Sequence, residues 1–293
     1  MEKVCLITDS ASDLPKDLAQ EYDIWVLPVT VTYGGKEARE YYDIEPKEFW
    51  DFLETHEELP STAQISPAQY LEAFARAEAE GYDKVICLMI NGDGSGTLAS
   101  GKVAIDLYRT EHTGGLDIRL IDSKNYTIAY GQAMVLARQA LREGVGFEEV
   151  VSLVEDHISR VEAVAAIFTL RQLKKSGRIN GAAAFMGELL GIKPMIHLCD
   201  GQVNIPVKVR GDKALLPKMF DYVRERADRS ADQRRACFVI HGDIPDREKE
   251  EVHAFLREEF GLENVRDIPF GCSLTTNTGP NVIGIVYYGE KRG

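Results

Sequence analysis

The residues that decide the fold class are Val85-Ile86-Cys87-Leu88-Met89-Ile90 and the segment that follows them, Asn91-Gly92-Asp93-Gly94-Ser95-Gly96-Thr97. The first six are apolar, and three of them are β-branched, which predicts a buried strand. Three glycines within the next seven residues predict a tight turn, and a helical pattern begins at Leu98. A strand, a turn and a helix in this order are typical of an α/β fold.

The same alternation extends through the first half of the chain. Short apolar runs rich in β-branched residues predict further strands at Val4–Thr8, Trp25–Thr32 and Ile118–Ile121. One helix is well marked after Ser66, because Ser66 can cap it, Pro67 fits its first turn, Gln69 completes a capping box and Gly81 suits its exit. We therefore expect a largely parallel sheet flanked by helices.

From about Ala163 the pattern restarts. A strand over Ala163–Phe168 precedes a short basic helix, paired strands around Asp200-Gly201, and a helix from about Asp212. Two later strands, Ala236–Ile240 and Val282–Tyr287, flank a helix rich in Glu. The sequence therefore predicts two α/β domains, residues 1–161 and 162–293, the second with a mixed sheet and helices.

Composition and charge exclude several classes of protein. Of the 293 residues, 44% are hydrophobic and 28% are charged, which describes a globular chain with a sizeable core. The formal net charge of −13 would repel the phosphates of nucleic acids and anionic lipid headgroups. No apolar run approaches the length of a membrane span and no secretory signal begins the sequence, so we expect a cytoplasmic protein without stable membrane insertion. The five widely spaced cysteines form no Cys-x-x-Cys pair and are interpreted as buried thiols.

Three polar segments follow predicted strands or precede predicted helices. Thr8-Asp9-Ser10 closes the first strand, where ligands collect in open α/β sheets, although caps and turns favour the same residues. Pro60-Ser61-Thr62-Ala63-Gln64 offers hydroxyls, or is an ordinary loop. The glycine-rich segment 91–97 could offer backbone N–H groups to an anion, although a purely structural turn explains it equally well. It lacks a Walker Gly-Lys-Ser/Thr ending, and Asp93 disfavours polyphosphate, so a single carboxylate suits it better.

Two basic clusters stand out on this acidic chain. Lys174-Lys175-Ser176-Gly177-Arg178 is typical of a helix end, where lysines complement the macrodipole, but Arg178 lies beyond the glycine and could contact a carboxylate or phosphate. Lys208, Arg210 and Lys213 mark a strand-to-helix junction, and a solvated surface explains them equally well.

No motif for catalysis or metal binding is evident. Thr275-Thr276-Asn277-Thr278-Gly279-Pro280 gathers hydrogen-bond donors, and we expect it to form a loop before the last strand. The six histidines are scattered, without the spacing of a metal site. The chain also lacks a Gly-x-Ser-x-Gly elbow and a Gly-x-Gly-x-x-Gly dinucleotide fingerprint. We therefore expect no catalytic residue, no metal and no cofactor.

Taken together, these segments resemble the signatures of the DegV family of fatty-acid-binding proteins, in the family's order and along nearly the whole chain. The matching motifs are Thr8-Asp9-Ser10-x-x-Asp13-Leu14-Pro15, Pro60-Ser61-Thr62-x-Gln64, Ser95-Gly96-Thr97, Asp122-Ser123, Leu173-Lys174-Lys175-Ser176-Gly177-Arg178-Ile179, Ile192-Lys193-Pro194, Lys208-x-Arg210 and Thr278-Gly279-Pro280.

The resemblance implies two α/β domains with a lipid held between them, the carboxylate in polar loops and the acyl tail in an apolar tunnel of the C-terminal domain. It also implies the acyl-carrying subunit of a bacterial fatty acid kinase, in which a separate kinase phosphorylates the bound carboxylate and the acyl phosphate feeds phospholipid synthesis. Thr62 matches a carboxylate contact of the family. With it we group, as candidate carboxylate-binding residues, Ser10, Gly92, Ser95, Gly96, Thr97, Thr276 and Asn277.

Other residues are assigned to the tail and to the partner. Arg178 and Arg210 match basic positions that the family uses toward the head group or the kinase, and Lys208 joins them as a candidate for partner docking. An ordinary hydrophobic core explains any single candidate tunnel residue at least as well; these candidates are Phe168, Leu173, Phe185, Met186, Leu189, Leu190, Ile192 and Met195.

The sequence departs from the family pattern in three places. Asn91-Gly92 stands where the family has Ser-Ser, Asn277 and Asn281 stand in place of the His and Gly that flank Thr-Gly-Pro, and Ala63 and Ile65 replace Ser and Pro. Asn can donate a hydrogen bond but carries no charge, so these changes bear more on acyl-phosphate handling than on lipid binding. Two other hypotheses stay open: an enzyme acting on a small anionic metabolite, and a binding module that holds lipid only as a structural filler.

Overall fold

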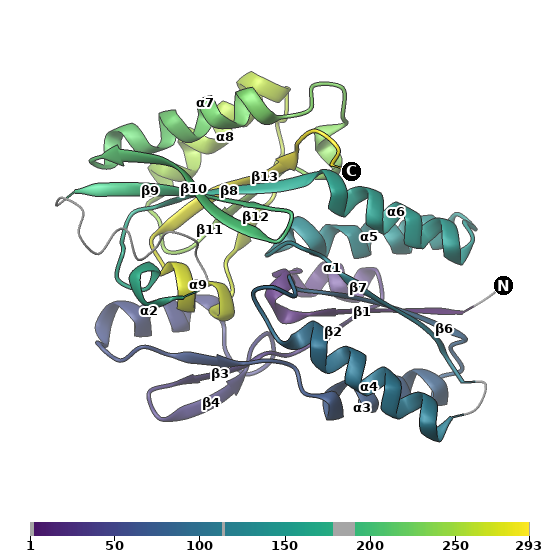
Figure 1. Ribbon diagram of the computed structural model, residues 1–293. Coiled ribbons are helices and arrows are strands. Elements are labelled where there is room, and N and C mark those ends of the chain that lie inside the picture. Colours follow the sequence, from purple (N-terminus) through teal and green to yellow (C-terminus); the bar gives the residue numbers. More distant parts are fainter. Residues whose placement is uncertain (1–2, 113–114, 178–190, 293) are drawn as a thin grey trace.

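The structure is a computed structural model that describes residues 3–112, 115–177 and 191–292. Figure 1 shows two sheets stacked with helices outside and between them, in five layers. Helices α3 (Pro67–Ala79) and α4 (Thr97–Glu111) form one outer layer, and α7 (Leu215–Arg226) and α8 (Asp246–Phe260) form the other. The prediction of a two-part α/β fold is confirmed.

The N-terminal sheet has four parallel strands in the order β2-β1-β6-β7. Their bounds are β1 Val4–Asp9, β2 Ile24–Leu27, β6 Lys84–Met89 and β7 Asp117–Asp122. Because the strands run in the same direction, their carboxyl ends share one edge of the sheet. The polar segments that follow β1 and β6 therefore lie at that edge.

The C-terminal sheet has six strands in the order β10-β9-β8-β13-β11-β12. It is mixed, because β11 and β12 pair in parallel and the other neighbours pair antiparallel. The bounds are β8 Val161–Ile167, β9 Ile192–Cys199, β10 Gln202–Arg210, β11 Phe238–His241, β12 Asp267–Pro269 and β13 Val282–Tyr288.

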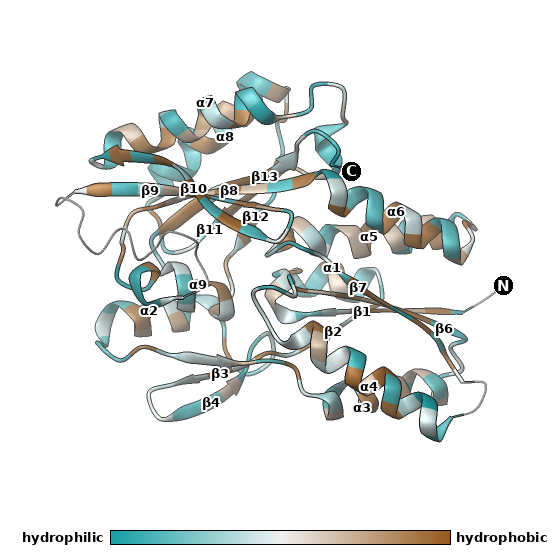
Figure 2. Ribbon diagram, viewed as in Figure 1, coloured by the Kyte–Doolittle hydropathy of each residue, from teal (hydrophilic) through white to brown (hydrophobic). Residues whose placement is uncertain are grey.

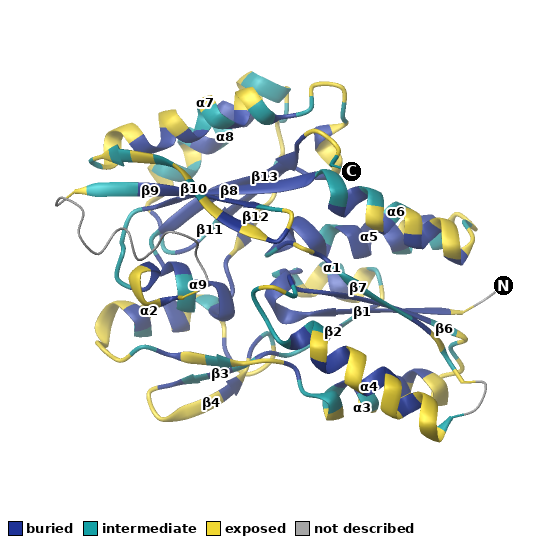
Figure 3. Ribbon diagram, in the orientation of Figure 1, coloured by how far each residue is buried: buried dark blue, intermediate teal, exposed yellow. Residues whose placement is uncertain are grey.

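Helices α5 (Ile128–Arg142) and α6 (Phe147–Arg160) lie between the two sheets, and one apolar cluster joins both sheets through them. Figure 2 shows the strands as largely hydrophobic, and Figure 3 shows α5 and the central strands as buried. The two halves of the chain therefore share a core. Among the described residues we find no helix with the length and apolar character that crossing a membrane requires.

Smaller elements complete the polar edge. A short 3-10 turn, η1 (Ser10–Ser12), and helix α1 (Lys16–Glu21) follow β1. A third sheet has the order β4-β3-β5. The remaining bounds are β3 Thr30–Tyr33, β4 Lys36–Arg39, β5 Ser61–Ala63, α2 Pro46–Thr55, η2 Leu173–Lys175, η4 Asp212–Ala214, η5 Gln233–Arg235 and α9 Cys272–Thr278.

Several local predictions are confirmed. Ser66 and Gln69 form a reciprocal capping box at the start of α3. Asp200 and Gly201 make the turn between β9 and β10, both with positive φ, and Gly177 follows η2 with a φ of 63°. All five cysteines are free thiols; four of them are buried as expected, whereas Cys199 is half-buried.

Three local predictions are wrong. Ser61–Ala63, which we expected in a loop, form strand β5. The single strand expected over Trp25–Thr32 is divided into β2 and β3, because Pro28 lacks the N–H that a continuous ladder needs. The loop expected over residues 275–280 is largely helix α9, which ends at Thr278.

Candidate ligand-binding site

A cavity of about 370 Å³ lies at the carboxyl ends of β1 and β6, and we call it the polar pocket. The turn after β6, strand β5 and helix α9 form most of its walls. Its lining residues are Ala11, Val29, Thr62, Ala63, Gln64, Ile90, Gly92, Asp93, Gly94, Ser95, Gly96, Ala99, Tyr126, Ser273, Leu274 and Asn277.

The glycine-rich turn uses most of its N–H groups within the protein. Gly92 N–H donates to Asp122 Oδ1 over 3.1 Å, and Asp93 N–H donates to the side chain of Asn91. Gly94 and Ser95 N–H both donate to the carbonyl of Asn91. The N–H of Thr97 donates to the Ser95 hydroxyl. Of the N–H groups from 92 to 97, only that of Gly96 has no acceptor among the described residues, so the turn is not an open anion cradle.

Asn91, one of the departures from the family pattern, joins the two halves of the molecule. Its side chain is 1% exposed, and its amide donates to the carbonyl of Gly201 and to the hydroxyl of Tyr126, both over 2.8 Å. The amide therefore ties the turn after β6 to the β9–β10 turn. A serine hydroxyl has a single proton and could not donate both bonds.

Strand β5 brings Thr62 to the pocket with its hydroxyl available. We find no hydrogen-bond partner for the Thr62 side chain within the described ranges, whereas the neighbouring Gln64 donates to Ser100. Gln64 also packs so closely on Gly96 that a Cβ at that position would lie 1.8 Å from Gln64 Oε1. A larger residue at position 96 would therefore require the Gln64 side chain to move away from the start of α4.

Helix α9 forms the opposite wall and uses its polar side chains internally. The hydroxyls of Thr275, Thr276 and Thr278 and the amide of Asn277 each donate to the backbone carbonyl four residues earlier. These bonds satisfy side chains that we expected in a loop. Asn277 lines the polar pocket beside Ser273 and Leu274.

Buried carboxyl groups stand behind the pocket walls. Asp9 accepts hydrogen bonds from Ile90 N–H, Ala11 N–H and the Tyr130 hydroxyl, at 2.7, 3.0 and 2.6 Å. Burial raises the pKa of Asp9 to about 6, although these hydrogen bonds oppose the rise. Three segments that line or back the pocket are thus fixed to one carboxyl group.

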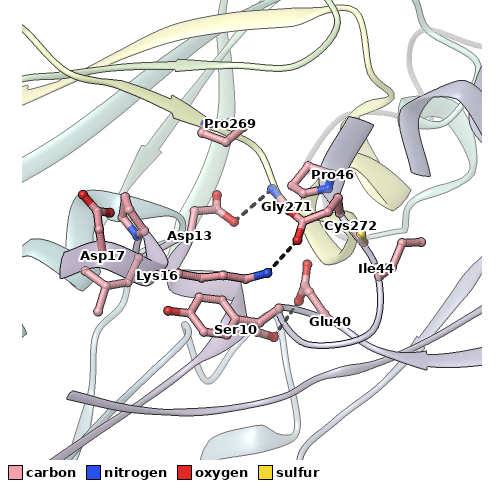
Figure 4. Close-up of a pocket in the computed structure, with 14 residues that line it drawn as sticks. Ser10, Asp13, Lys16, Asp17, Glu40, Ile44, Pro46, Pro269, Gly271 and Cys272 are labelled. Carbon is pink, nitrogen blue, oxygen red and sulfur yellow. Dashed lines mark hydrogen bonds and ion pairs between the residues drawn. The ribbon is translucent and has the colours of Figure 1, made fainter. Parts of the chain in front are cut away.

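Two further carboxyls hold the start of α9 (Figure 4). Glu40 Oε1 accepts from Ser273 N–H over 2.7 Å, and its other oxygen accepts from the Ser10 hydroxyl over 2.6 Å. Asp13 Oδ1 accepts from Gly271 N–H over 2.9 Å. Burial raises the pKa of both carboxyls, and for Asp13 the nearby Glu40 raises it further. These side chains cap α9 from the N-terminal half of the chain.

A second cavity, of about 290 Å³, lies in front of Asp13 and Glu40 and is the one drawn in Figure 4. Its rim carries the ion pair between Lys16 and Glu45, at 2.6 Å, and its walls are largely apolar. Ser10 lines this cavity and not the polar pocket.

An apolar pocket of about 50 Å³ adjoins the polar pocket under β9 and β10. The two pockets share Tyr126, Leu274 and Asn277. The other lining residues of the apolar pocket are Ile196, Leu198, Val203, Phe270 and Thr278. A polar cavity and an apolar one thus lie side by side at the boundary of the two sheets and share part of their lining.

Five of the eight candidate carboxylate-binding residues line the polar pocket: Thr62, Gly92, Ser95, Gly96 and Asn277. The other three do not line it. The hydroxyl of Ser10 donates to Glu40, that of Thr97 accepts from Ile65 N–H, and that of Thr276 donates within α9.

None of the four candidate tunnel residues that the structure describes lines the apolar pocket. Phe168 and Met195 pack with α7 and α8, on the other face of the C-terminal sheet. Leu173 is buried in the cluster shared by both sheets, and Ile192 is half-buried at the start of β9. Phe185, Met186, Leu189 and Leu190 lie outside the described residues.

The basic candidates are spread along the surface. Lys208 and Arg210 are exposed on β10, an edge strand, and Lys213 is exposed in η4. Arg178 lies outside the described residues. The sequence reasoning missed Gln64, Tyr126, Leu274 and the apolar pocket residues. Of these, only Val203 carried a usable signal, because it lies in a strand whose side chains alternate between inside and outside.

One group of potential metal ligands occurs in the described part of the chain, away from both pockets. Ligand atoms of Glu162, His197 and Cys199 lie within 4.8 Å of one another. Both oxygens of Glu162 already accept from the Arg226 guanidinium, and Arg292 lies 3.3 Å away. Two guanidinium groups beside the carboxylate oppose a cation at this place.

With the pockets defined, the chain can be compared with known proteins. A family model described as an uncharacterised protein of the DegV family matches residues 3–290. The chain belongs to the DegV family. It is 31% identical to a DegV domain-containing protein of Caldanaerobacter subterraneus subsp. tengcongensis, over 99% of this chain and all of the relative.

Solved structures of DegV proteins share this architecture over their full length. A fatty-acid-binding DegV family protein from Streptococcus agalactiae is 26% identical and superposes with a TM-score of 0.86, covering 99% of this chain and 100% of that protein. A DegV family protein from Thermus thermophilus, described by its fatty acid binding, is 27% identical with a TM-score of 0.83, covering 98% and 100%. Both structures are described as binding fatty acids.

Proposed function

We propose that this DegV protein binds a long-chain fatty acid non-covalently, with the head group in the polar pocket and the acyl chain leading into the apolar pocket. The observation that carries the proposal is that a polar and an apolar cavity adjoin and share the lining residues Tyr126, Leu274 and Asn277. Fatty acid binding by the S. agalactiae and T. thermophilus relatives supports it.

The division of the site into polar and apolar parts suits an amphipathic ligand. Each CH₂ group that leaves water contributes about 0.8 kcal/mol, so the acyl chain can supply most of the affinity. Thr62 and Gly96 N–H then serve as donors that fix the orientation of the head group.

The finer proposal is that the protein presents the head group to a separate kinase, which forms the acyl phosphate used for phospholipid synthesis. Lys208 and Arg210 support a docking role, because both are exposed on β10, an edge strand of the described sheet, and basic side chains can contact an anionic partner. Arg178 is the third candidate for this surface. In this proposal the chain is a carrier subunit that works in the cytoplasm.

A carrier is favoured over an enzyme that turns over a soluble anion. No histidine, cysteine or lysine lines the polar pocket within the described ranges, and Asp93 is the one titratable carboxyl group among its described lining residues. The nearest candidate nucleophile, the Ser95 hydroxyl, donates to Thr97 over 3.1 Å.

The direct test is to denature the purified protein, extract it into organic solvent and identify the released molecules by mass spectrometry, with a mock purification as the control. We expect about one fatty acid per chain. Absence of lipid, together with no rise in melting temperature when fatty acids are added, would contradict the proposal.

A matched pair of variants locates the ligand. Leu274→Trp adds bulk where the two pockets meet and should lower the lipid content at least about tenfold. Leu107→Trp, at a side chain 44% exposed on α4, should leave it unchanged. Circular dichroism verifies that both variants are folded. Equal lipid in both would place the ligand elsewhere.

A further inference from the structure

We propose that the polar pocket selects an uncharged head group, so that a fatty acid binds there in its protonated form in preference to its carboxylate. This inference rests on the fatty acid binding proposed above and adds the ionisation state of the ligand. The charges around the pocket and the hydrogen bonds of the glycine-rich turn carry it.

The charged groups that face the pocket through its walls are acidic. Asp93 lines it directly, and no lysine, arginine or histidine does so among the described residues. Asp122 holds Gly92 N–H, Asp9 holds the N–H groups of Ile90 and Ala11, and Glu40 holds Ser273 N–H. Four elements thus each place a carboxyl group on or one residue behind the wall, where a ligand carboxylate would be repelled.

Among the described residues, the lysines that adjoin these elements are exposed. Lys124, two residues beyond Asp122, has a side chain that is 56% exposed and lies 3.1 Å from Asp200. Lys174 and Lys175 are exposed on η2, which contacts α9. Ammonium groups in such positions are screened by water and cannot offset carboxyls that are buried.

Backbone donors do not replace the missing cation. Anion sites without cations need several converging N–H groups. Here the N–H groups of the turn after β6, except that of Gly96, already donate to acceptors within the protein. Thr62 hydroxyl and Gly96 N–H can donate to the carbonyl oxygen of a carboxylic acid. The acid's own O–H needs an acceptor, which Asp93 can supply. The donors and acceptors therefore match a neutral acid, alcohol or amide.

The buried carboxyls of the protein show what this environment does to an acid. Burial raises the pKa of Asp9 to about 6 and raises the pKa of Glu40 and of Asp13, with Glu40 adding to the effect on Asp13. Tyr130, packed against Asp9, is neutral, and burial raises its pKa. A ligand carboxyl group placed among them experiences the same forces.

The test compares dodecanoic acid with dodecanamide, each below its solubility limit, by calorimetric titration of the full chain at pH 6, 7 and 8. We expect the affinity for dodecanoic acid to fall by up to about tenfold per pH unit, because the protonated fraction falls by that factor above a carboxyl pKa near 4 to 5. The affinity for the amide should stay constant. Constant dodecanoic acid affinity beside measurable amide binding would overturn the inference. Failure of both ligands at every pH would instead reject the proposed function.

Two lysine substitutions on one exposed face of α4 separate the charge of the pocket from other sources of pH dependence. Ala99→Lys adds an ammonium group to the pocket lining, and Val103→Lys adds one a turn further along, at a side chain 50% exposed. We expect Ala99→Lys to reduce the slope for dodecanoic acid to less than about threefold per pH unit and Val103→Lys to leave it unchanged. Equal slopes in the two variants would overturn the inference. An affinity of the wild type for dodecanoic acid that is constant with pH, but becomes pH-dependent in Arg178→Gln, would also overturn it.

Discussion

Two regions of this molecule bury carboxyl groups, and they treat them in opposite ways. Behind the polar pocket, Asp9, Asp13 and Glu40 accept hydrogen bonds from neutral N–H and hydroxyl groups, and burial raises the pKa of each. On β8, burial alone would also raise the pKa of Glu162, but hydrogen bonds from His197 and Arg226 lower it well below its usual range. Burial raises the pKa in both regions, and the charge of the hydrogen-bonding partners decides whether a carboxyl inside this protein stays ionised.

The difference separates a structural ion cluster from the surroundings of a binding site. Glu162 is 1% exposed and has two guanidinium groups beside it, so its charge is compensated inside the protein. The three carboxyls near the polar pocket have no such partner within the described ranges. Their hydrogen bonds position η1, the end of β6 and α9. A charged group there has a raised free energy, and we propose that the ligand head group experiences the same effect.

The largest effect should come from breaking the compensated region. Arg226→Met leaves Glu162 buried without its bidentate partner, and we expect a loss of about 3 kcal/mol in the free energy of unfolding, measured by urea denaturation. Arg224→Met is the matched control, because Arg224 lies on the same helix but pairs with Glu259 at the surface, and should cost less than about 1 kcal/mol. Similar losses of unfolding free energy in both variants would mean that the ion pair between Arg226 and Glu162 does not stabilise the fold more than a surface pair does.

Substituting glutamine for glutamate in each region tests the contrast directly. Glu162→Gln removes the charge that faces Arg226 and Arg292, and should cost about 2 kcal/mol. Glu40→Gln keeps an oxygen for Ser273 N–H and should cost less than about 1 kcal/mol, since the Ser10 hydroxyl can turn to accept. The same urea titrations measure both. A larger loss for Glu40→Gln than for Glu162→Gln would contradict the proposed difference between the two regions.

The pH dependence of the unfolding free energy should also distinguish the two regions, with a smaller effect than the substitutions above. The folded-state pKa of Asp9, about 6, lies above its unfolded value, so this carboxyl stabilises the fold below about pH 4 and loses that contribution as the pH rises through 6. Glu162 has a lowered pKa, so its contribution is present above its unfolded value and is lost only on strong acidification.

The stability difference between wild type and Asp9→Asn isolates the Asp9 contribution. Taking this difference also cancels the contribution of His157, whose pKa burial lowers to about 4 and whose effect on stability has the opposite dependence on pH. We expect wild type to gain about 1 kcal/mol relative to the variant between pH 7.5 and pH 5, from unfolding curves at both values. A difference that does not change with pH would show that Asp9 does not titrate in this interval.

The sequence predicted the elements that local residues determine. The capping box at Ser66 and the Asp200-Gly201 turn each depend on a few neighbouring residues, and both are confirmed. Helix α9 was missed because it begins without a side-chain cap of its own. Its first N–H groups bind Asp13 and Glu40, which are more than 230 residues away in the chain, and no local pattern encodes that contact.

The candidate site was predicted unevenly for a related reason. The polar lining was recognisable because Gly92, Ser95 and Gly96 lie in a glycine-rich turn of distinctive composition, and because Thr62 matches a position of the family. The apolar lining was not, because β9 is buried on both faces and shows no alternation. Met195 therefore looked equivalent to Ile196, although the first faces α7 and the second faces the pocket.

The smallest expected effect uses two tyrosines that make the same bond in the two regions. Tyr130 donates to Asp9 over 2.6 Å, and Tyr287 donates to Glu162 over 2.9 Å, and both side chains are fully buried. Tyr287→Phe should cost about 1 to 2 kcal/mol at pH 5 and at pH 7.5, because Glu162 stays ionised. Tyr130→Phe should cost up to about 1 kcal/mol less at pH 5 than at pH 7.5, because protonated Asp9 is a weaker acceptor. Urea titrations of both variants at the two pH values measure this, and the same pH dependence in both would mean that the two regions do not differ in charge.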